Sequence, residues 1–346
     1  MMKKIIAIII FITARLISTA QDPHFTQFAN APQMLNPALT GNFGGTARLN
    51  NSYRTQWSAL GDGYKTLHFS GDAPVGKKGT KNNFFGVGAM IVQDKAGIAG
   101  FKSTFIEGSI SYTTAIDPNA NHYFALGFQA GLNQQSLDLT KSTWDSQWNG
   151  DLFDPALSSG ESIQLQQLTW LDFNTGVLYY FFPDDGNFFN LGASYSHIGG
   201  PDISFYTNKD YPLSTKITVH SGAEIKFNKS GEEWIVPKAL YSQQGVQKEI
   251  LAGAYYKRKV QFKSKYTNYK KEAYFYVGGF YRLDDAFCVA ARIEFNTLGL
   301  GFSYDVNTSS LSKMAGASNA FELNLSFISF VKRGNKAKTA SLPRYF

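Results

Sequence analysis

The feature that most constrains this chain is an alternation of apolar and polar residues with a period of two. In residues 46–57, for example, Leu49 and Tyr53 belong to one face, and Arg48 and Arg54 belong to the other. Because successive side chains of a strand point to opposite faces, this pattern predicts a β-strand with one apolar side. The comparable segments are 46–57, 66–73, 84–92, 103–114, 122–132, 168–181, 188–198, 216–227, 234–241, 249–256, 273–282, 286–295, 297–306 and 320–329.

These segments predict an all-β chain of about 14 strands. Turn-forming residues separate several of them, as in Asp-Pro-Asn at 117–119 and Pro-Asp-Asp-Gly at 183–186. No helical periodicity competes over a comparable length, and no apolar run after residue 20 is long enough for a membrane-spanning helix. The chain shows no repeat beyond the alternation within the strands, and no linker that would divide it into two domains.

Two architectures accommodate so many alternating strands: a soluble sandwich, propeller or barrel, and an outer-membrane barrel whose apolar side faces lipid. Only 17% of the residues are charged, 15% are aromatic and 32 are glycine, so the polar faces are largely small and neutral. Tyrosine and phenylalanine gather at strand ends, as at 179–182 and 274–276, where membrane barrels carry their aromatic girdles. Both observations favour the membrane barrel.

Connection lengths support the same architecture, because membrane barrels alternate short periplasmic turns with longer external loops. The fifth, seventh and thirteenth connections, 133–167, 199–214 and 307–319, are long, whereas their even-numbered neighbours are short. The tenth, 257–272, is an exception: either the preceding strand continues through 260–262 or the predicted register slips there. The predicted fold is therefore an all-β, transmembrane antiparallel β-barrel of about 14 strands with both termini periplasmic.

The N-terminus predicts export from the cytoplasm, and together with the barrel this predicts the outer membrane of a Gram-negative cell. Lys3 and Lys4 precede an apolar stretch at 5–12, and small residues at 18–20 follow, which are the three parts of a secretory signal peptide. An N-terminal anchor helix is the alternative, but the apolar stretch is short for a bilayer. We therefore expect a signal peptide at 1–20, a periplasmic cap or plug at 21–45, the barrel at 46–330 and a basic periplasmic tail at 331–346.

Several functional classes find little support in the residues. The single cysteine, Cys288, forms no internal disulfide, and with the five histidines it provides no zinc-finger spacing. The net charge of +7 falls when the leader is removed, and the basic residues are scattered, so nucleic-acid binding is not expected. Gly86-x-Gly88 and Gly299-x-Gly301 lie within strands, which indicates close packing or a narrowed lumen rather than a phosphate loop.

The acidic fifth connection is the remaining candidate for ion binding or catalysis. Its Asp145, Asp151 and Asp154 do not match the register of a helix-loop-helix calcium site, although a non-standard external calcium site stays open. His68 and His220 fall in different strands, so a metal site would need them to converge. No serine lies in a nucleophile-elbow context. We expect a non-enzymatic protein with no catalytic residue, no metal site and no cofactor.

Motifs along the chain occur in a recognisable order. They are Gln21-Asp-Pro-His-Phe-Thr-Gln-Phe, Asn36-Pro37-Ala38, Arg54-Thr-Gln-Trp57, Gly278-Gly-Phe-Tyr-Arg282, Gly301-Phe-Ser-Tyr-Asp305 and Leu342-Pro-Arg344-Tyr-Phe346. Together they resemble the PorP/SprF family of outer-membrane proteins of Bacteroidota, over almost the whole mature chain. The loop 133–167 is longer than expected for the family, and the tail lacks the cysteine often found before the final Pro-Arg-Phe.

The resemblance implies a barrel component of the type IX secretion system, which supports export or surface attachment of large adhesins and, in gliding species, motility. The partners it implies are periplasmic ring or translocon proteins of that system and the C-terminal domain of a secreted adhesin. Outer-membrane lipid and lipopolysaccharide would surround the barrel. The residues leave open an outer-membrane transporter for hydrophobic small molecules and, as a third hypothesis, a surface enzyme that uses the acidic fifth connection.

Seven residues are candidates for partner binding or for a network inside the lumen. They are Asn36, Pro37, Arg54, Trp57, Arg282, Asp305 and Arg344. Asn36-Pro37 predicts a bend that turns 21–45 towards the first strand, because proline fixes its own φ and disfavours helix at the preceding residue. Arg54 and Trp57 predict a lumen ion pair and an interface anchor, with partner contact as the alternative. Arg282 and Asp305 are likewise expected in a lumen network.

Overall fold

The computed structural model describes residues 22–57, 63–76, 83–97, 100–138, 144–154, 156–160, 166–183, 186–206, 210–227, 232–262, 272–308 and 319–330. The predicted signal peptide at 1–20 and the predicted tail at 331–346, which includes Arg344, lie outside these residues. Within the described part, no helix is both long enough and apolar enough to cross a bilayer.

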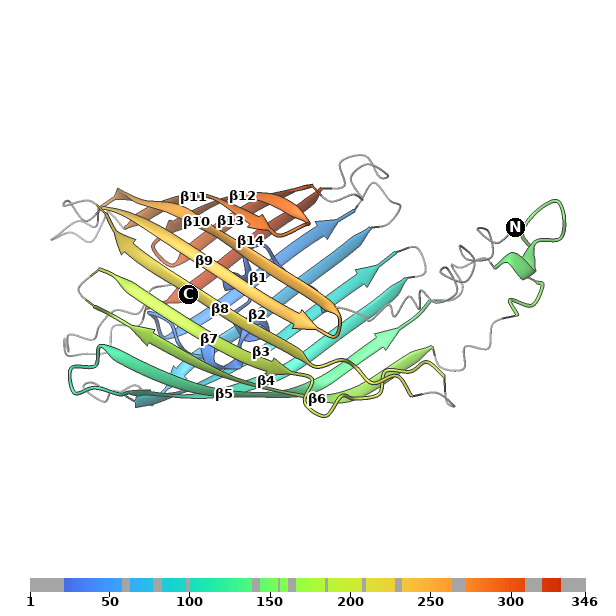
Figure 1. The fold of residues 1–346 in the computed structure, drawn as a ribbon, viewed down its shortest axis with the longest axis horizontal. Coiled ribbons are helices and arrows are strands. Elements are labelled where there is room, and N and C mark those ends of the chain that lie inside the picture. The colour runs from blue at the N-terminus through green and yellow to red at the C-terminus, as the bar shows by residue number, and fades with distance from the viewer. Residues whose placement is uncertain are drawn as a thin grey trace, which may run out of the picture.

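Fourteen antiparallel strands of the described chain close into one barrel, in which sequence neighbours pair and β1 pairs with β14 (Figure 1). The strands are β1 (Ala47–Gln56), β2 (Tyr64–Val75), β3 (Asn83–Ala96), β4 (Phe101–Ala115), β5 (His122–Ser136), β6 (Gln167–Phe181), β7 (Phe188–Ser196), β8 (Lys216–Lys226), β9 (Glu233–Gln244), β10 (Gln247–Gln261), β11 (Ala273–Arg282), β12 (Ala286–Phe295), β13 (Leu298–Asn307) and β14 (Ala320–Ser329). The predicted 14-strand antiparallel barrel is confirmed.

β10 extends into the tenth connection, which explains the length of that connection in the sequence pattern. β10 continues to Gln261, and its pairing with β11 shifts between Lys259 and Gln261, as a β-bulge does. The first of the two explanations is therefore correct, with an irregularity near the strand end. Other strands also run further than their sequence pattern, because backbone pairing extends past the last clear alternation, as in β5, which ends at Ser136.

The burial pattern of the strands is opposite to that of a soluble protein. On β12, Phe287 and Ile293 are 48% and 52% exposed on the outside, whereas Arg292 and Glu294 are 6% and 2% exposed on the inside. The same alternation, with apolar side chains outward and charged side chains inward, recurs around the barrel. A soluble barrel would bury the apolar set, so lipid must cover this outer surface.

The connections gather at two ends of the barrel. We call the end that carries connections such as 137–166, 197–215 and 308–319 the odd-loop end, and the opposite end, with connections such as 116–121 and 182–187, the even-turn end. The first strand begins and the last strand ends at the even-turn end, as an even strand number requires. In Figure 1 the odd-loop end lies to the right.

A segment at 22–46, the lumen segment, runs inside the barrel before β1. It contains η1 (Phe28–Asn30), α2 (Pro32–Leu35) and η2 (Pro37–Leu39), and most of its side chains are buried (Figure 1). Asp22 contacts His197 and Lys216 at the odd-loop end, whereas Thr46 contacts Ser329 at the even-turn end. The lumen segment therefore spans the length of the barrel. Although β1 begins at the even-turn end, Asp22 lies at the odd-loop end.

Replacement of Val289 by arginine tests the assignment of the outer surface. Val289 is 47% exposed in the middle of β12, and we expect V289R to lower the free energy of unfolding by about 2–4 kcal/mol, since arginine at the bilayer midplane is costly. The matched control is V246R, in the turn between β9 and β10, where valine is 64% exposed outside the apolar surface. Urea unfolding in liposomes measures both, and equal effects would contradict lipid contact at Val289.

Candidate functional site between the lumen segment and the barrel wall

Glycines on the inner wall make room for the lumen segment. A Cβ atom at Gly127 of β5 would overlap the backbone of Pro37 and Ala38, and one at Gly86 of β3 would overlap the carbonyl of Thr40. Gly88, Gly176 and Gly301 face side chains of the lumen segment in the same way. Close packing or a narrowed lumen was predicted at Gly86-x-Gly88 and Gly299-x-Gly301. Gly86, Gly88 and Gly301 are positions where the lumen segment packs directly against the wall.

Asn36 and Pro37 form the bend of the lumen segment. Asn36 is extended, with φ −163° and ψ 120°, and Pro37 opens η2, as the restriction before proline requires. The amide of Ala38 donates to Asn36 Oδ1 over 2.9 Å, and Asn36 Nδ2 donates to the carbonyl of Val177 over 2.9 Å. Asn36 Nδ2 also lies 3.1 Å from His220 Nε2. The Asn-Pro motif therefore caps its own helix and fastens it to β6 and β8.

A second fastening lies near the even-turn end. Arg48 of β1 makes two hydrogen bonds to the Asp72 carboxylate, at 2.9 and 2.7 Å, and a third to the carbonyl of Leu39 at 3.1 Å. The amide of Gly41 donates to the same carboxylate over 2.7 Å. The Arg48 guanidinium also lies 4.5 Å above the Phe43 ring, which is fully buried. Two wall residues thus hold three residues of the lumen segment.

The central contact of the site is a buried arginine network around Thr26. Arg54 lies 2.8 Å from Asp305 and 3.2 Å from Glu322, and Arg282 lies 3.3 Å from the same oxygen of Asp305. The Thr26 hydroxyl donates to Asp305 over 2.7 Å and accepts from Arg54 and Arg282. Its backbone amide donates to Glu322 over 2.8 Å. One threonine of the lumen segment therefore connects charges from β1, β11, β13 and β14.

The N-terminal end of the lumen segment is held by a cluster around His197. Its Nδ1 lies 2.7 Å from Asp172 and its Nε2 lies 3.0 Å from Asp22, so both ring nitrogens face carboxylates. Lys216 adds a contact of 3.2 Å to Asp22. Burial lowers the pKa of His197, but the Asp22 and Asp172 carboxylates outweigh it and raise the pKa to about 10. The ring is therefore protonated at neutral pH and binds Asp22 as a cation.

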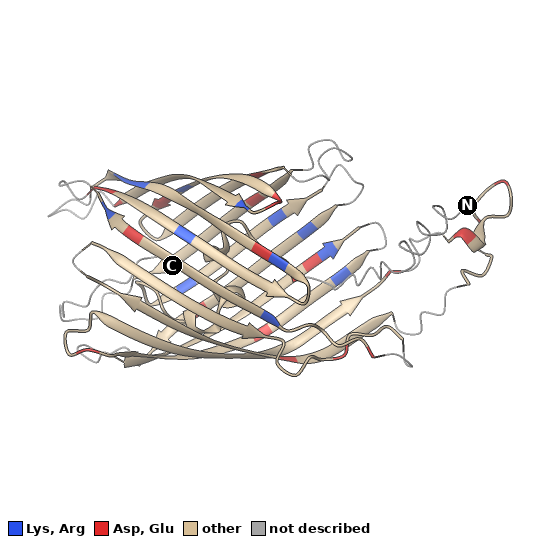
Figure 2. Ribbon diagram, in the orientation of Figure 1, with Lys and Arg blue, Asp and Glu red and all other residues tan. Residues whose placement is uncertain are grey.

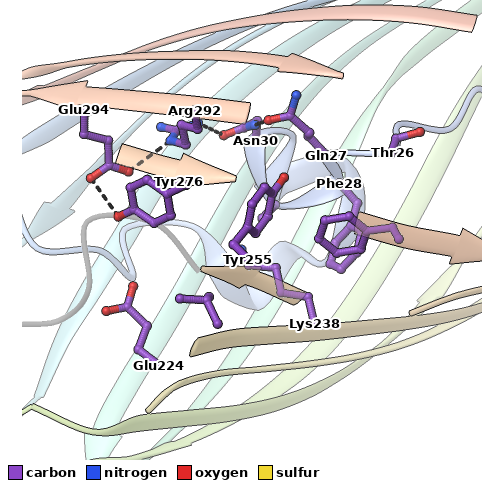
Figure 3. A pocket seen from close by; sticks show the side chains of 13 residues that line it. Thr26, Gln27, Phe28, Asn30, Glu224, Lys238, Tyr255, Tyr276, Arg292 and Glu294 are labelled. Carbon is purple, nitrogen blue, oxygen red and sulfur yellow. Dashed lines mark hydrogen bonds and ion pairs between the residues drawn. The ribbon is translucent and has the colours of Figure 1, made fainter. Parts of the chain in front are cut away.

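On the side of β8 to β12, the lumen segment leaves a hollow of about 500 Å³ that is partly open (Figure 3). Tyr255 and Phe28 line it together with Arg292 and Glu294. Arg292 donates to Glu294 over 3.0 Å and to Asn30 of η1 over 2.7 Å, so these charges are already paired. The hollow therefore lies beside the contact between η1 and the wall and does not interrupt it.

The candidate residues from the sequence fall into four groups. Arg54, Arg282 and Asp305 meet in the Thr26 network, and Asn36 and Pro37 lie in the bend described above. Trp57 lies apart from them, at the end of β1, where its ring meets Tyr64 edge-on at 5.1 Å. Arg344 lies outside the described residues.

Other members of the site were not predicted. They are Asp22, Thr26, Arg48, Asp72, Asp172, His197, Arg292, Glu294 and Glu322. For the strand residues the available signal was a charge on the polar face of an alternating segment. Among the described residues, no three His, Cys, Asp or Glu side chains converge to hold a metal ion. In the fifth connection, Asp154 instead accepts a hydrogen bond from the amide of Ala156.

Replacement of Gly127 by valine tests the fit between wall and lumen segment. We expect G127V to weaken docking of η2 by about 1–3 kcal/mol, because the new side chain overlaps the backbone of Pro37 and Ala38. Single-barrel conductance in planar bilayers should rise as the lumen segment leaves its seat. The control is G108V, where the nearest atoms to a new Cβ are 4.0 Å away. Equal conductance in the two variants would contradict this fit.

The His197 cluster predicts a pH dependence. Since the pKa of His197 rises from 6.5 to about 10 on folding, its contribution to stability is complete below pH 6.5 and is lost as the pH rises through 10. The difference in unfolding free energy between the native protein and H197Q should therefore be constant in acid and shrink towards zero above pH 10. Urea titrations of both proteins from pH 6 to 11 measure it, and a constant difference across this range would rule out the charged cluster.

Comparison with known proteins adds the family. Solved structures with a similar fold include the toluene transporter TodX of Pseudomonas putida, with 12% identity over 86% of this chain and 92% of that chain and a TM-score of 0.49. The toluene transporter TbuX of Ralstonia pickettii has 10% identity over 88% and 94%, with a TM-score of 0.47. BamA from Haemophilus ducreyi lacking POTRA domains 1–3 has 9% identity over 82% and 70%, with a TM-score of 0.42.

At these identities the likeness lies in barrel architecture alone. No protein of curated function matches the sequence. The profile of the PorP/SprF family, described as a type IX secretion system membrane protein, matches residues 17–327 and so covers the lumen segment and nearly all of the barrel. The chain therefore belongs to the PorP/SprF family of type IX secretion system membrane proteins.

Proposed function

We propose that this outer-membrane barrel is a non-enzymatic component of type IX secretion that supports export or surface attachment of large adhesins through protein contacts. The observation that carries the proposal is the segment that is fastened inside the lumen. The lumen segment is fastened by the His197 cluster, the Thr26 network and the Arg48–Asp72 pair, from one end of the barrel to the other. A barrel that is filled in this way acts through its two ends rather than as an open conduit.

The proposal assigns a partner to each end. The odd-loop end, with its long fifth and seventh connections, faces the outside and receives the C-terminal domain of a secreted adhesin. The even-turn end faces the periplasm, where the tail at 331–346 and the short turns meet ring or translocon proteins. Export by the predicted signal peptide brings the chain to the outer membrane, and the chain supports motility in a gliding species.

A transporter for hydrophobic small molecules is the second candidate, because one observation favours it. β6 begins at Gln167, whereas β7 ends at Ser196 and pairs only with the half of β6 from Thr175 onward. Part of the connection after β7 covers the edge of β6 that β7 leaves unpaired, where Trp170 packs against Ile203 and Leu213. A wall that is closed here by a loop rather than by a paired strand favours lateral entry of a hydrophobic solute. Beside the lumen segment, a second hollow of about 380 Å³ is lined in part by Phe25, Phe28, Met34, Leu35 and Leu240.

A disulfide lock separates the two candidates. The Thr40 and Ser109 hydroxyl oxygens lie 2.9 Å apart, so cysteines at these positions have the proximity to join the lumen segment to β4. The variant T40C/S109C is made in a C288A background and expressed in cells that lack the native gene. We expect normal adhesin display from the oxidised lock, because docking at the ends does not need the lumen segment to move.

The gene deletion alone should leave nutrient uptake intact while adhesin accumulates inside the cell. The single variant T40C in the same background controls for loss of the Thr40 hydroxyl. Loss of display on locking, restored by reduction, would contradict the docking role and favour a conduit. Loss of hydrophobic solute uptake on locking, with adhesin display unaffected by the deletion, would favour the transporter.

A further inference from the structure

Three lysines form a row across neighbouring strands at the odd-loop end. Lys65 of β2 lies opposite Lys95 of β3, and Lys95 lies opposite Lys102 of β4. Neighbouring strands are about 4.8 Å apart, so the three backbone positions span roughly 10 Å. Figure 2 shows basic positions near one end of adjacent strands.

The row points outward, towards lipid. Lys65 has the same strand parity as the exposed Leu67 and Phe69, and Lys95 has that of Ile91, which is 47% exposed. All three lysines are themselves exposed. The nearest acidic neighbour, Asp94, has the opposite parity and accepts a hydrogen bond of 2.6 Å from Thr66. The lysine side chains therefore project from the outer surface at the odd-loop ends of β2, β3 and β4, beside the outward apolar residues.

No carboxylate of the described residues forms an ion pair with any of these three lysines, which contrasts with lysines on the inner wall. Lys216, Lys257 and Lys259 each have a carboxylate within 3.2 Å. Like charges on adjacent strands repel, by about 1 kcal/mol per pair at 4 Å in water and more beside lipid. A row of this kind is stable when an anion lies between the ammonium groups.

From this arrangement we propose that Lys65, Lys95 and Lys102 bind the phosphate groups of lipid headgroups in the membrane leaflet at the odd-loop end. Lysine ammonium groups are compact cations with three donors each, and they suit phosphate oxygens. A headgroup held by acyl chains brings its phosphate to the boundary between apolar and polar surface, where the ammonium groups lie. A glycolipid that carries two phosphates can contact more than one of the three ammonium groups.

The opposite end of the barrel lacks such a row among its described residues. Outward charges there are Arg258 and Glu233, which have opposite signs and lie 3.8 Å apart. At the odd-loop end, Lys248 of β10 is a further exposed lysine but stands apart from the three. Among the described residues, the outward lysines without a carboxylate partner therefore gather at the odd-loop end. This inference needs only the membrane position of the barrel and is independent of the secretion role.

Lipid retention by the purified, full-length barrel tests the site. The protein is placed in phosphatidylcholine nanodiscs that contain a small fraction of bisphosphorylated lipid A, extracted again in mild detergent, and analysed for bound lipid by mass spectrometry. We expect K65Q/K95Q/K102Q to lower lipid A retention by up to roughly a hundredfold, since each lysine near an anionic surface contributes about fivefold. The arginine variant K65R/K95R/K102R should stay within about twofold of the native protein.

Two further arms identify the chemical group that is bound. Dephosphorylated lipid A should be retained no better by the native barrel than by the glutamine variant, and 10 mM inorganic phosphate should not displace lipid A. R258Q, at the even-turn end, is the position control. Equal retention by native and glutamine proteins, or full retention of dephosphorylated lipid, would overturn the proposal, and complete displacement by phosphate would assign the row to the free ion. If the triple variant fails a heat-shift gel, K95Q replaces it.

Discussion

The buried charges of the inner wall are the constraint on which the rest of the structure depends. Arg54 and Glu322 are 1% and 0% exposed, and an ion removed from water in this way is tolerated only when its hydrogen bonds are completed. The wall alone does not complete them. Thr26 contributes its hydroxyl and its amide to the two groups, so the lumen segment supplies part of what the strands require. Barrel and lumen segment are therefore one folding unit.

The strands could be predicted because their signal is local. Lipid outside and polar groups inside impose the same two-residue period on every strand, and that period is visible in about ten residues of sequence. The lumen segment has no such period. Its contacts join residues as distant as Thr26 and Glu322, so a local pattern gives no indication of which wall residues it meets.

The candidate site shows the same division. Arg54, Arg282 and Asp305 could be placed in the lumen from strand parity and from the family motifs. Their contact with Thr26 could not be predicted, although Thr26 lies in the first motif, because no strand period shows which wall residues an irregular segment meets. The bend at Asn36 and Pro37 was predictable from the stereochemistry of proline. The site on the wall where this bend docks was not predictable. It depends on the absence of side chains at Gly127 and Gly176, and glycine within a strand has several explanations.

The position of Thr26 has a consequence for assembly. Three of its four partners come from β1, β13 and β14, which lie at or beside the seam where the cylinder closes, and its own segment is covalently attached to β1. A finished cylinder would have to be threaded from one mouth to the other to admit this segment. The simpler order is that the segment docks against the inner face first and β14 then pairs with β1. Pairing of these two strands would then occur only after the segment is in place.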